Sequence, residues 1–286
     1  MFDPDEYLLI DFGEGRRLER FGPFTLDRPC PAAEKFARHD LGPWSRADAR
    51  FDRTEGKLGR WVDQVRLPRS WVIRHGAIRF ELKRTDFGHL GVFPEQAANW
   101  DWIAQQVAAA GDRVRVLNLF AYTGGSTLVA AAAGAEVSHV DAARNVVAWA
   151  RKNAELSGLA SAPIRWITED AMKFVRRELK RGNRYDAVIL DPPSYGHGPR
   201  GEVWRLAKHL EPLMAMCVQL TGGRPRFLLL TCHTPKFGPR RLKARLAAAL
   251  GPAARGQLVA VPMELISVAR KRLPSGTVVR WQRDES

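Results

Sequence analysis

The sequence predicts a doubly wound α/β fold, in which a mostly parallel sheet of seven strands follows a small β-rich module. From about Asp112, short apolar runs alternate with segments whose apolar residues repeat every three or four positions, as in strands joined by helices. Before that point, apolar runs lie close together and are separated by glycine turns, which is typical of hairpins. We therefore expect a β-rich amino-terminal module with a lead-in segment over residues 1–100 and a sheet domain over residues 101–286.

Seven apolar runs are the candidate strands of the sheet. They are VRVLNLF (114–120), AEVSHVD (135–141), PIRWIT (163–168), DAVILD (186–191), RFLLLT (226–231), QLVAVPM (257–263) and TVVRWQ (277–282). The clearest helix between them has one apolar stripe facing the sheet, formed by Val203, Leu206, Leu210, Leu213, Cys217 and Leu220. A cysteine on such a stripe is expected to be inert packing. Residues 101–110 are expected to form a helix that links the module to the sheet domain.

The amino-terminal module is expected to contain two hairpins. YLLIDF and RRLERFGPFTL flank the turn GEG, and WVIRH and AIRFELK flank Gly76. The polar, glycine-bearing segment 39–59 between them is expected to be irregular.

Composition bounds the class of protein. A chain of 286 residues that is 45% hydrophobic can bury a sizeable core, and it contains no apolar run of the roughly 20 residues that a membrane span needs. We expect a cytoplasmic protein that does not bind membranes, because the acidic start MFDPDEY is unlike a secretory signal. Three cysteines without a C-x-x-C pair indicate neither a disulfide framework nor a metal site. The sequence leaves the oligomeric state open.

The net charge of +14 favours a polyanionic partner such as RNA. This inference is discounted because arginine outnumbers lysine 35 to 10, and a GC-rich genome raises arginine content without any nucleic acid being bound. The basic clusters at 176–184, 239–246 and 269–272 can also be solvated faces of helices or loops.

A loop of small residues, AYTGGST, follows the first strand of the sheet domain, where doubly wound folds bind their ligands. Its glycines are only Gly124 and Gly125, which is not the G-x-G-x-x-G of a dinucleotide site, and no G-K-S/T of a P-loop follows. The loop therefore favours a nucleoside ligand without phosphates over NAD.

Two acidic residues follow the next two strands. Asp141 lies sixteen residues beyond Gly125, where a carboxylate can accept hydrogen bonds from the hydroxyls of an adenosine ribose. Asp170, followed by Ala171, can accept a hydrogen bond from the adenine amine. Either acid alone can instead cap the helix that follows it, but two at consecutive strand ends favour a ligand site.

The fourth strand ends in the motif DPPSY. The carboxylate of Asp191 and the carbonyl of Pro192 are acceptors, and the proline rings remove backbone donors that would compete with them. An exocyclic amine of a nucleobase can donate to both acceptors, while Tyr195 offers a ring for stacking or is simply packed.

Several motifs in order resemble one known family. LNLFAYTGGSTLVAAAAGA, HVDAARNVVAWARKNAELSGL, RWITEDAMKFVRRE and YDAVILDPPSYGHGP are similar to the class I S-adenosylmethionine-dependent methyltransferases, and within them to large-subunit ribosomal RNA methyltransferases that include the cytosine-C5 enzymes. The segment FGHLGVFPEQAANW is similar to the lead-in of that family, and the resemblance spans roughly residues 79–281. It implies a Rossmann-like sheet whose last strand is antiparallel. The first hundred residues show no RNA-binding motif that we can assign, and in this the sequence departs from the family. The motifs therefore point to methyl transfer more directly than to RNA as its substrate.

The resemblance also implies a set of roles. S-adenosylmethionine would be the cofactor and a base of ribosomal RNA the substrate. The cofactor would lie against Phe120, Thr123, Gly124, Gly125, Asp141, Asp170 and Ala171. The catalytic residues would be Asp191, Pro192, Tyr195 and Cys232, and the substrate would contact Phe93, Gln96, Ser194 and His233. An amphipathic entry loop is the alternative interpretation of the segment that contains Phe93 and Gln96.

Cys232, in TCHTP after the fifth strand, corresponds to the nucleophile of the cytosine-C5 relatives. Carbon 5 of cytosine becomes nucleophilic only after a thiolate adds to carbon 6, so such an enzyme needs a thiol, activated here by His233 or by the cofactor's positive charge. A small buried cysteine that only packs is an equal alternative for Cys232, and a loop histidine without catalytic role is the alternative for His233. Methylation of a base amine, of a protein or of a small molecule, and a catalytically silent RNA-binding module, remain open.

Overall fold

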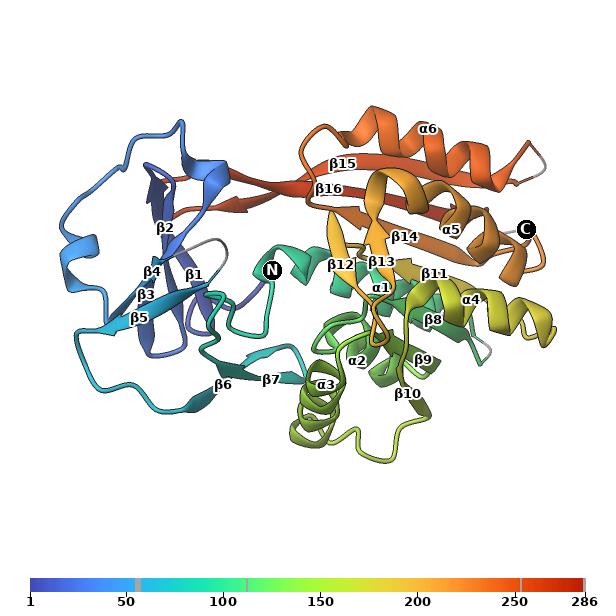
Figure 1. Cartoon of the computed structure of the whole chain (residues 1–286), viewed down its shortest axis with the longest axis horizontal. Coiled ribbons are helices and arrows are strands. Elements are labelled where there is room, and N and C mark those ends of the chain that lie inside the picture. The colour runs from blue at the N-terminus through green and yellow to red at the C-terminus, as the bar shows by residue number, and fades with distance from the viewer. Residues whose placement is uncertain (55–57, 112, 253, 285–286) are drawn as a thin grey trace. The chain divides into compact units, whose positions relative to one another are not determined.

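The computed structural model describes residues 1–54, 58–111, 113–252 and 254–284. The chain divides into two compact units. The first consists of Met1–Ala98 and Glu264–Ser275, and the second of Asn99–Met263 and Gly276–Ser286. Figure 1 shows the elements of both units with their labels. No helix of the described residues is both long and apolar enough to cross a membrane.

The first unit is built on a sheet of five strands in the order β1-β2-β3-β4-β5. These strands are β1 (Tyr7–Gly13), β2 (Arg16–Phe21), β3 (Phe24–Pro29), β4 (Ala49–Arg53) and β5 (Gly59–Asp63). The expected first hairpin is confirmed, because β1 and β2 are antiparallel and Glu14 and Gly15 turn between them with positive φ. The second is confirmed in β6 (Ser70–His75) and β7 (Ile78–Lys83). Three short 3₁₀ helices complete this unit, η1 (Pro31–Ala33), η2 (Pro43–Arg46) and η3 (Pro94–Gln96).

The expectation that residues 39–59 are irregular is wrong in its second half. Strand β4 lies there, parallel to β3 and antiparallel to β5. Its residues ARFDR alternate in burial, and Ala49 and Phe51 are fully buried. The other three residues are charged, so the sequence contains only two apolar positions that could indicate a strand. Residues 55–57 of this segment lie outside the described residues.

The second unit contains a sheet of seven strands in the order β10-β9-β8-β11-β14-β16-β15. Its strands are β8 (Arg115–Leu119), β9 (Glu136–Asp141), β10 (Ile164–Thr168), β11 (Ala187–Leu190), β14 (Phe227–Cys232), β15 (Gly256–Ile266) and β16 (Arg272–Arg283). The first five are parallel neighbours, and β16 is antiparallel to β14, so the predicted sheet is confirmed. The two other strands, β12 (Tyr195–His197) and β13 (Val203–Arg205), form a separate hairpin.

Helices connect these strands. They are α1 (Ala97–Ala109), α2 (Gly125–Ala132), α3 (Arg144–Leu156), α4 (Ala171–Lys180), α5 (Leu206–Leu220) and α6 (Pro239–Leu250). The linking helix expected over 101–110 is α1, which begins four residues earlier than the first residue of that range. Figure 1 shows α4, α5 and α6 on one face of the sheet and α2 and α3 lower in the view.

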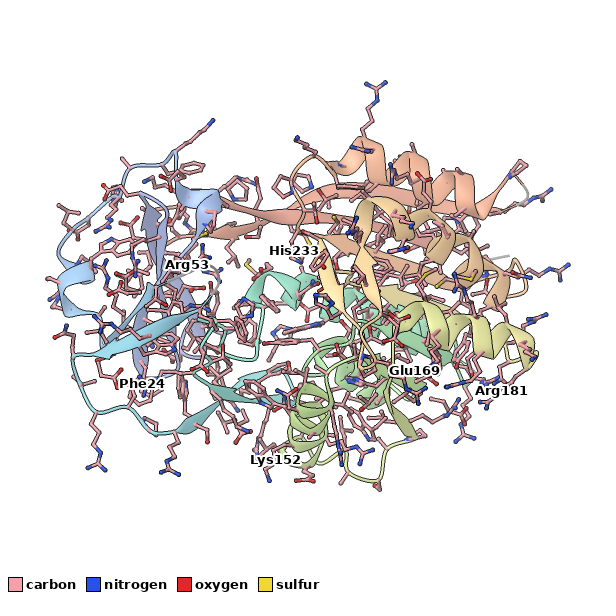
Figure 2. All side chains as sticks on the ribbon, in the orientation of Figure 1. Phe24, Arg53, Lys152, Glu169, Arg181 and His233 are labelled. Atoms are coloured by element: carbon pink, nitrogen blue, oxygen red, sulfur yellow. The ribbon has the colours of Figure 1, made fainter. Side chains whose placement is uncertain are left out.

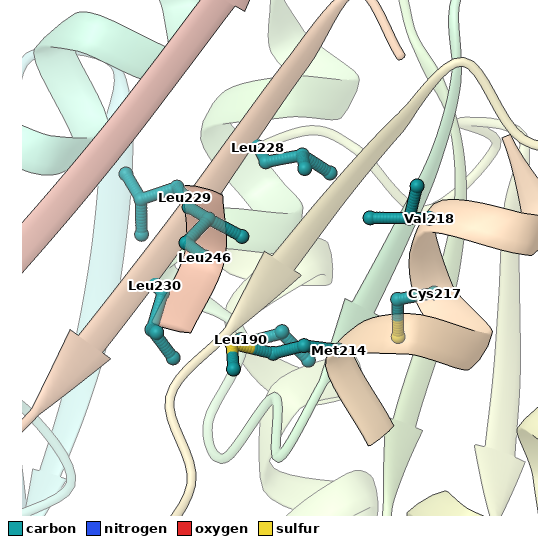
Figure 3. Close-up of a pocket in the computed structure, with 8 residues that line it drawn as sticks. All are labelled: Leu190, Met214, Cys217, Val218, Leu228, Leu229, Leu230 and Leu246. Atoms are coloured by element: carbon teal, nitrogen blue, oxygen red, sulfur yellow. The ribbon is translucent and has the colours of Figure 1, made fainter. Parts of the chain in front are cut away.

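The apolar stripe of α5 packs on the sheet, with one correction. Leu206, Leu210, Leu213, Cys217 and Leu220 are buried as expected, but Val203 belongs to β13 and is 43% exposed. Figure 3 shows how Cys217 lies among apolar side chains of α5, β11, β14 and α6. Burial raises the pKa of the Cys217 thiol far above its ordinary value, so this thiol stays protonated and inert.

A buried polar chain lies under α2. The Asn118 side chain donates to Thr127 Oγ1 over 2.9 Å, and Thr127 Oγ1 lies 2.9 Å from Nδ1 of His139. His139 is fully buried and its ring packs against Trp166, and its Nε2 has no hydrogen-bond partner among the described residues. Burial, with a smaller contribution from Arg151, lowers the pKa of His139 to about 3. This imidazole is therefore neutral in the folded protein at neutral pH.

Acidification is expected to destabilise the protein through His139. The folded state takes up this proton only near pH 3, whereas the unfolded chain does so near 6.5, so the stabilisation is complete above pH 6.5 and is lost as the pH falls. Between pH 7 and pH 5 the free energy of unfolding should fall by about 2 kcal/mol from this residue alone. Urea unfolding at both pH values, in the wild type and in His139→Gln, checks this. An equal pH dependence in the two proteins would contradict it.

Candidate active site

The parallel strands bring the expected site residues to one edge of the sheet. Leu119, at the end of β8, pairs with Val140 of β9 and with Leu190 of β11, and Leu190 pairs with Leu230 of β14. The residues that follow these strands therefore start from adjacent positions, which we call the carboxyl edge. The predicted cofactor side, after β8, β9 and β10, and the predicted substrate side, after β11 and β14, meet there.

The loop between β8 and α2 has an unusual backbone. Phe120 and Tyr122 have φ of 56° and 49°, and Gly124, the N-cap of α2, has φ of 93°. Left-handed conformations are uncommon for aromatic residues and cluster at ligand sites. The Tyr122 N–H donates to Oδ2 of Asp141 over 2.9 Å, and the Ala121 N–H donates to the Val140 carbonyl. The end of β9 thus holds the loop in this shape.

The two loop glycines are required for different reasons. Gly124 takes a left-handed conformation, and a Cβ there would lie 3.2 Å from the Cβ of Ala150. A Cβ on Gly125 would lie 2.5 Å from the ring of Trp100, which is 4% exposed. Nothing in the sequence indicated that Trp100 would contact the cofactor loop. Gly125 is therefore fixed by packing as well as by any cofactor that the loop binds.

We expect Gly125→Ala to disturb both stability and cofactor binding. The added methyl group must displace the buried Trp100 ring or the loop, which overpacks the site at a cost of about 1–3 kcal/mol. Thermal unfolding and calorimetric titration with the cofactor measure the two effects. Gly238→Ala is a matched control, since a Cβ there meets nothing within 4 Å. Equal behaviour of the two variants would show that the loop tolerates the extra volume.

The two acids of the cofactor side have different surroundings. Asp141 accepts hydrogen bonds from Tyr122 N at Oδ2 and from Ala143 N at Oδ1. Ala143 is the N-cap of α3 and no side chain caps that helix, so Asp141 is not a helix cap. Burial raises the pKa of Asp141, although its backbone hydrogen bonds act in the opposite direction. Asp170 does cap α4, because its Oδ1 accepts from Lys173 N over 2.9 Å.

The remaining cofactor-side residues line the same strand ends. Thr123 and Ala171 are buried, and the Thr123 carbonyl accepts a hydrogen bond from the Asn153 side chain over 3.0 Å. Glu169, labelled in Figure 2, precedes Asp170 and pairs with Arg177 of α4 at 2.7 Å. Carboxylates at the ends of β9 and β10, beside a loop without basic side chains, suit an adenosine that carries hydroxyls and an amine but no phosphate.

Asp191 is held by the strand next to its own. Its Oδ1 accepts a hydrogen bond from Thr231 Oγ1 over 2.5 Å, and Nε2 of His233 lies 3.4 Å from the same oxygen. Thr231 is fully buried, whereas the Asp191 and His233 side chains are 31% and 37% exposed. A buried hydroxyl therefore fixes the direction of a carboxylate that solvent and a substrate can reach.

Cys232 follows Thr231 and is 1% exposed. Burial raises the pKa of its thiol, and the charge of Asp191 acts in the same direction, while hydrogen bonds from Thr234 lower it. Thr234 Oγ1 also lies 2.6 Å from Ser194 Oγ. Asp191, Ser194, Cys232 and His233 are thus brought together, but the thiol is protonated and covered in this structure.

A tryptophan donates a hydrogen bond to the Asp-Pro-Pro segment. Pro192 is buried, and the Pro193 carbonyl accepts a hydrogen bond from Trp204 Nε1 over 2.7 Å. The Trp204 ring packs 4.8 Å from that of Phe120, which connects the substrate side to the cofactor loop. Tyr195 is 46% exposed in β12, where its ring contacts His197. Its exposure suits a stacking platform better than plain packing.

Besides Trp100, sequence reasoning missed Thr231, Thr234 and Trp204 at this edge. Thr231 and Thr234 flank Cys232 in the quoted TCHTP, where hydroxyls beside a candidate nucleophile were a usable signal. Trp204 gave none, because only the fold brings it to Pro193. Phe93 and Gln96 belong to the first unit, at η3, where Gln96 is buried and the Phe93 ring contacts His89. Their role at the carboxyl edge stays a prediction.

Comparison with known proteins gives the family. A model of S-adenosylmethionine-dependent methyltransferases matches residues 51–249. The chain belongs to this family. Its cofactor is S-adenosylmethionine, as expected from the resemblance. The Rossmann-like class I fold is confirmed as well.

Relatives agree with this assignment. The solved S-adenosylmethionine-dependent methyltransferase of Agrobacterium tumefaciens is 36% identical, with a TM-score of 0.91 over 98% of this chain and 91% of that one. The large-subunit ribosomal RNA methyltransferase I of Aeromonas hydrophila is 39% identical over 196 residues, which are 63% of this chain and 48% of the relative. The large-subunit ribosomal RNA methyltransferase K/L of Hahella chejuensis is 30% identical over 62% of this chain and 23% of the relative. The chain thus spans about half the length, or less, of these curated relatives.

Proposed function

We propose that this protein transfers a methyl group from S-adenosylmethionine to a base of ribosomal RNA, with carbon 5 of cytosine as the favoured target. One observation carries the proposal. Cys232, the last residue of β14, follows the threonine that holds Asp191, and Asp191 shares an edge with Asp141. A thiol, a carboxylate for the base and a carboxylate for the ribose would thus be carried by β14, β11 and β9, and only β8 separates β11 from β9. The names of the curated relatives support ribosomal RNA as the substrate.

The residues of the cofactor side have a positioning role. S-adenosylmethionine, when bound, supplies an electrophilic methyl group on a positively charged sulfur. Asp141 would accept hydrogen bonds from the ribose and Asp170 from the adenine amine. Phe120, Thr123, Gly124, Gly125 and Ala171 would line the rest of the cofactor site. Methyl transfer depends on alignment of the two reactants. The loops at this edge would accelerate it by holding the cofactor in line with the base.

The residues of the substrate side would handle the base. Asp191 and the Pro192 carbonyl would accept from the exocyclic amine and hold the ring, while Tyr195 stacks on it. The Cys232 thiolate would add to carbon 6, which makes carbon 5 nucleophilic. After methylation, His233 or a water molecule removes the proton from carbon 5, the carbon 5–carbon 6 double bond re-forms and the thiolate leaves. Ser194, whose Oγ lies 2.6 Å from Thr234 Oγ1, would contact the base or its ribose. Phe93 and Gln96 stay expected substrate contacts, as the family resemblance implies.

Methylation of a base amine is the second candidate, and one observation favours it. The Cys232 thiol is covered, and its pKa is raised by burial and by Asp191, so no thiolate is ready in this structure. An amine needs no covalent catalyst, since Asp191 and Pro192 alone can orient its nitrogen. The Cys232 variants considered in the Discussion separate the two candidates.

Two measurements test the proposal against a protein or small-molecule substrate and against a silent binding module. The affinity for single-stranded RNA should fall with salt with a log–log slope of about −0.7 for each phosphate neutralised. A flat response would exclude RNA. Calorimetric titration should show binding of S-adenosylmethionine, whereas a silent module would bind none. A ribosomal RNA substrate agrees with the cytoplasmic location that the sequence predicts.

A further inference from the structure

The opposite edge of the same sheet carries a row of arginines. We call it the amino edge, because the parallel strands begin there. Five neighbouring strands, β8, β11, β14, β16 and β15, each have an arginine within three residues of their end at this edge. These amino-edge arginines are Arg113, Arg115, Arg184, Arg224, Arg226, Arg255 and Arg283.

Backbone contacts show that this row is continuous. The Asp186 N–H donates to the Arg115 carbonyl, the Arg226 N–H donates to the Asp186 carbonyl, and the Arg283 N–H donates to the Arg226 carbonyl. Gly256, which follows Arg255, lies so close to the Gln282 carbonyl that no Cβ would fit. The five strands therefore present their arginines side by side, over about 19 Å at the usual strand spacing.

Some of these arginines serve the fold. Arg113 pairs with Glu136 at 2.9 Å, the Arg115 guanidinium lies 5.4 Å from the centre of the Tyr185 ring, and Arg226 donates to the Ala110 carbonyl. The other four are exposed and have no acidic partner within 4.0 Å among the described residues. They are Arg184, Arg224, Arg255 and Arg283. They contribute four positive charges that no interaction within the described chain compensates.

Acids near this edge do not neutralise the row. Besides Glu136, Glu178 is fully buried and lies near Arg165 and Arg181, and Asp186 uses one carboxylate oxygen to accept from the Arg115 N–H. Asp284 is exposed beside Arg283 but more than 4.0 Å from its charge. At the carboxyl edge the pattern is reversed, since β9 ends in Asp141, and Glu169 and Asp191 directly follow β10 and β11. Figure 2 shows the two ends of this unit, with Arg181 near one and His233 near the other.

The two edges also differ in aromatic side chains. Tyr195 offers an exposed ring at the carboxyl edge, as binding of an unpaired base requires. Among the described large apolar residues that are exposed, none lies at the amino edge, where Tyr185 is buried. A row of guanidinium groups without stacking rings suits phosphates and not bases, and phosphates are what a paired RNA helix presents.

We infer that the amino edge binds the phosphate backbone of a double-helical segment of the RNA substrate, separate from the segment that delivers the base to the carboxyl edge. This inference rests on the proposed function. A strand of five or six residues separates the two edges by about 17–20 Å, so a folded RNA must reach around the sheet to touch both. The protein therefore recognises a large structured RNA and discriminates against short single strands.

The test compares two variants that lose the same charge. The edge variant carries Arg184→Gln, Arg224→Gln, Arg255→Gln and Arg283→Gln. The control variant carries Arg176→Gln, Lys208→Gln, Arg240→Gln and Lys243→Gln. These side chains are exposed on α4, α5 and α6 and form no ion pair with any acid that the structure describes. Thermal unfolding first confirms that both fold. The probes are a 24-base-pair RNA duplex and a single-stranded 24-mer, titrated between roughly 50 and 200 mM salt.

The edge variant should bind the duplex about 100-fold more weakly at low salt, with a log–log salt slope shallower by about 3 to 4, as expected for four lost phosphate contacts. The control variant should lose at most about fivefold. Methyl transfer to structured ribosomal RNA should show a raised KM and an unchanged kcat in the edge variant.

Three results would overturn the inference. Equal losses in the two variants would show that only net charge matters, and unchanged duplex binding by the edge variant would leave an acidic protein as the occupant of this edge. Absence of duplex binding by the wild-type protein would also contradict the inference. Methyl transfer by the wild type to ribosomal RNA keeps these failures distinct from failure of the proposed function, because that transfer depends on the carboxyl edge.

Discussion

Replacement of Cys232 by alanine should lower the rate of methyl transfer to RNA by at least about 1000-fold and leave cofactor affinity unchanged. Without the thiolate, carbon 5 of cytosine does not become nucleophilic, whereas Asp141 and Asp170, the acids proposed to bind the cofactor, are unchanged. Transfer of labelled methyl groups and calorimetric titration with S-adenosylmethionine measure the two quantities. Full activity of the variant would leave methylation of a base amine as the function.

Cys217→Ala is the matched control for this experiment. Both cysteines are 1% exposed and belong to the same apolar core, so both replacements remove a buried sulfur at a similar cost in stability, but Cys217 lies on α5 and not at a strand end. Cys217→Ala should retain activity within about threefold. Loss of activity in both variants, with matching losses of stability, would mean that packing and not chemistry explains the effect.

The pH dependence gives an independent check on Cys232. Burial raises the pKa of this thiol, so its thiolate fraction grows tenfold for each pH unit until the pH reaches that raised pKa. The rate of methyl transfer should therefore rise from pH 7 to pH 9 and level off only above the ordinary pKa of a thiol. A rate that is flat across this range would contradict attack by Cys232.

The second large effect is expected for Asp191. Asp191→Asn keeps the shape of the side chain but places an N–H₂ group where the base amine must donate, so kcat/KM should fall by about 100-fold or more. Cofactor affinity should stay unchanged. The measurement is steady-state methyl transfer together with cofactor titration.

Two further variants make this result specific. Asp186→Asn changes the carboxylate that precedes β11 at the amino edge, whose role is to accept the Arg115 N–H, and it should have little effect on kcat. Thr231→Val removes only the hydroxyl that fixes Asp191, and we expect a fall in kcat of about tenfold with KM unchanged, since Thr231 is a positioning residue. An Asp191→Asn protein as active as the wild type would show that this carboxylate does not orient the base.

The sheet of the second unit was predictable because its central strands, such as β11 and β14, are buried on both faces. Such strands are continuous apolar runs. All seven expected runs lie in strands, although β15 and β16 extend beyond the expected residues and β10 and β15 are partly exposed. In the first unit, β4 is short, charged and half exposed, so its two inward residues are too few for a periodic signal. Val203 was misplaced because it lies at helical spacing from Leu206, whereas the chain is still extended in β13 and only turns into α5 after it.

The candidate site was predictable to the extent that strand ends define it. Asp141, Asp170, Asp191 and Cys232 follow apolar runs, and the topology of parallel strands collects them without further information. The partners that fix these residues are less visible, because Trp204 and Trp100 reach the edge through tertiary packing alone. The sequence left open whether Cys232 is buried, since exposure of a residue at a strand end depends on the loops that cover it, and the structure buries it.

The central claim is that the carboxyl edge sets the methyl donor against a base of ribosomal RNA. The most direct test incubates the purified protein with S-adenosylmethionine carrying a labelled methyl group and with ribosomal RNA from cells that lack the protein, and then identifies the labelled nucleoside by mass spectrometry. We predict a single labelled nucleoside, 5-methylcytidine, that is absent with the Asp191→Asn protein. Label in no nucleoside, or label only in protein or small molecules, would contradict the claim.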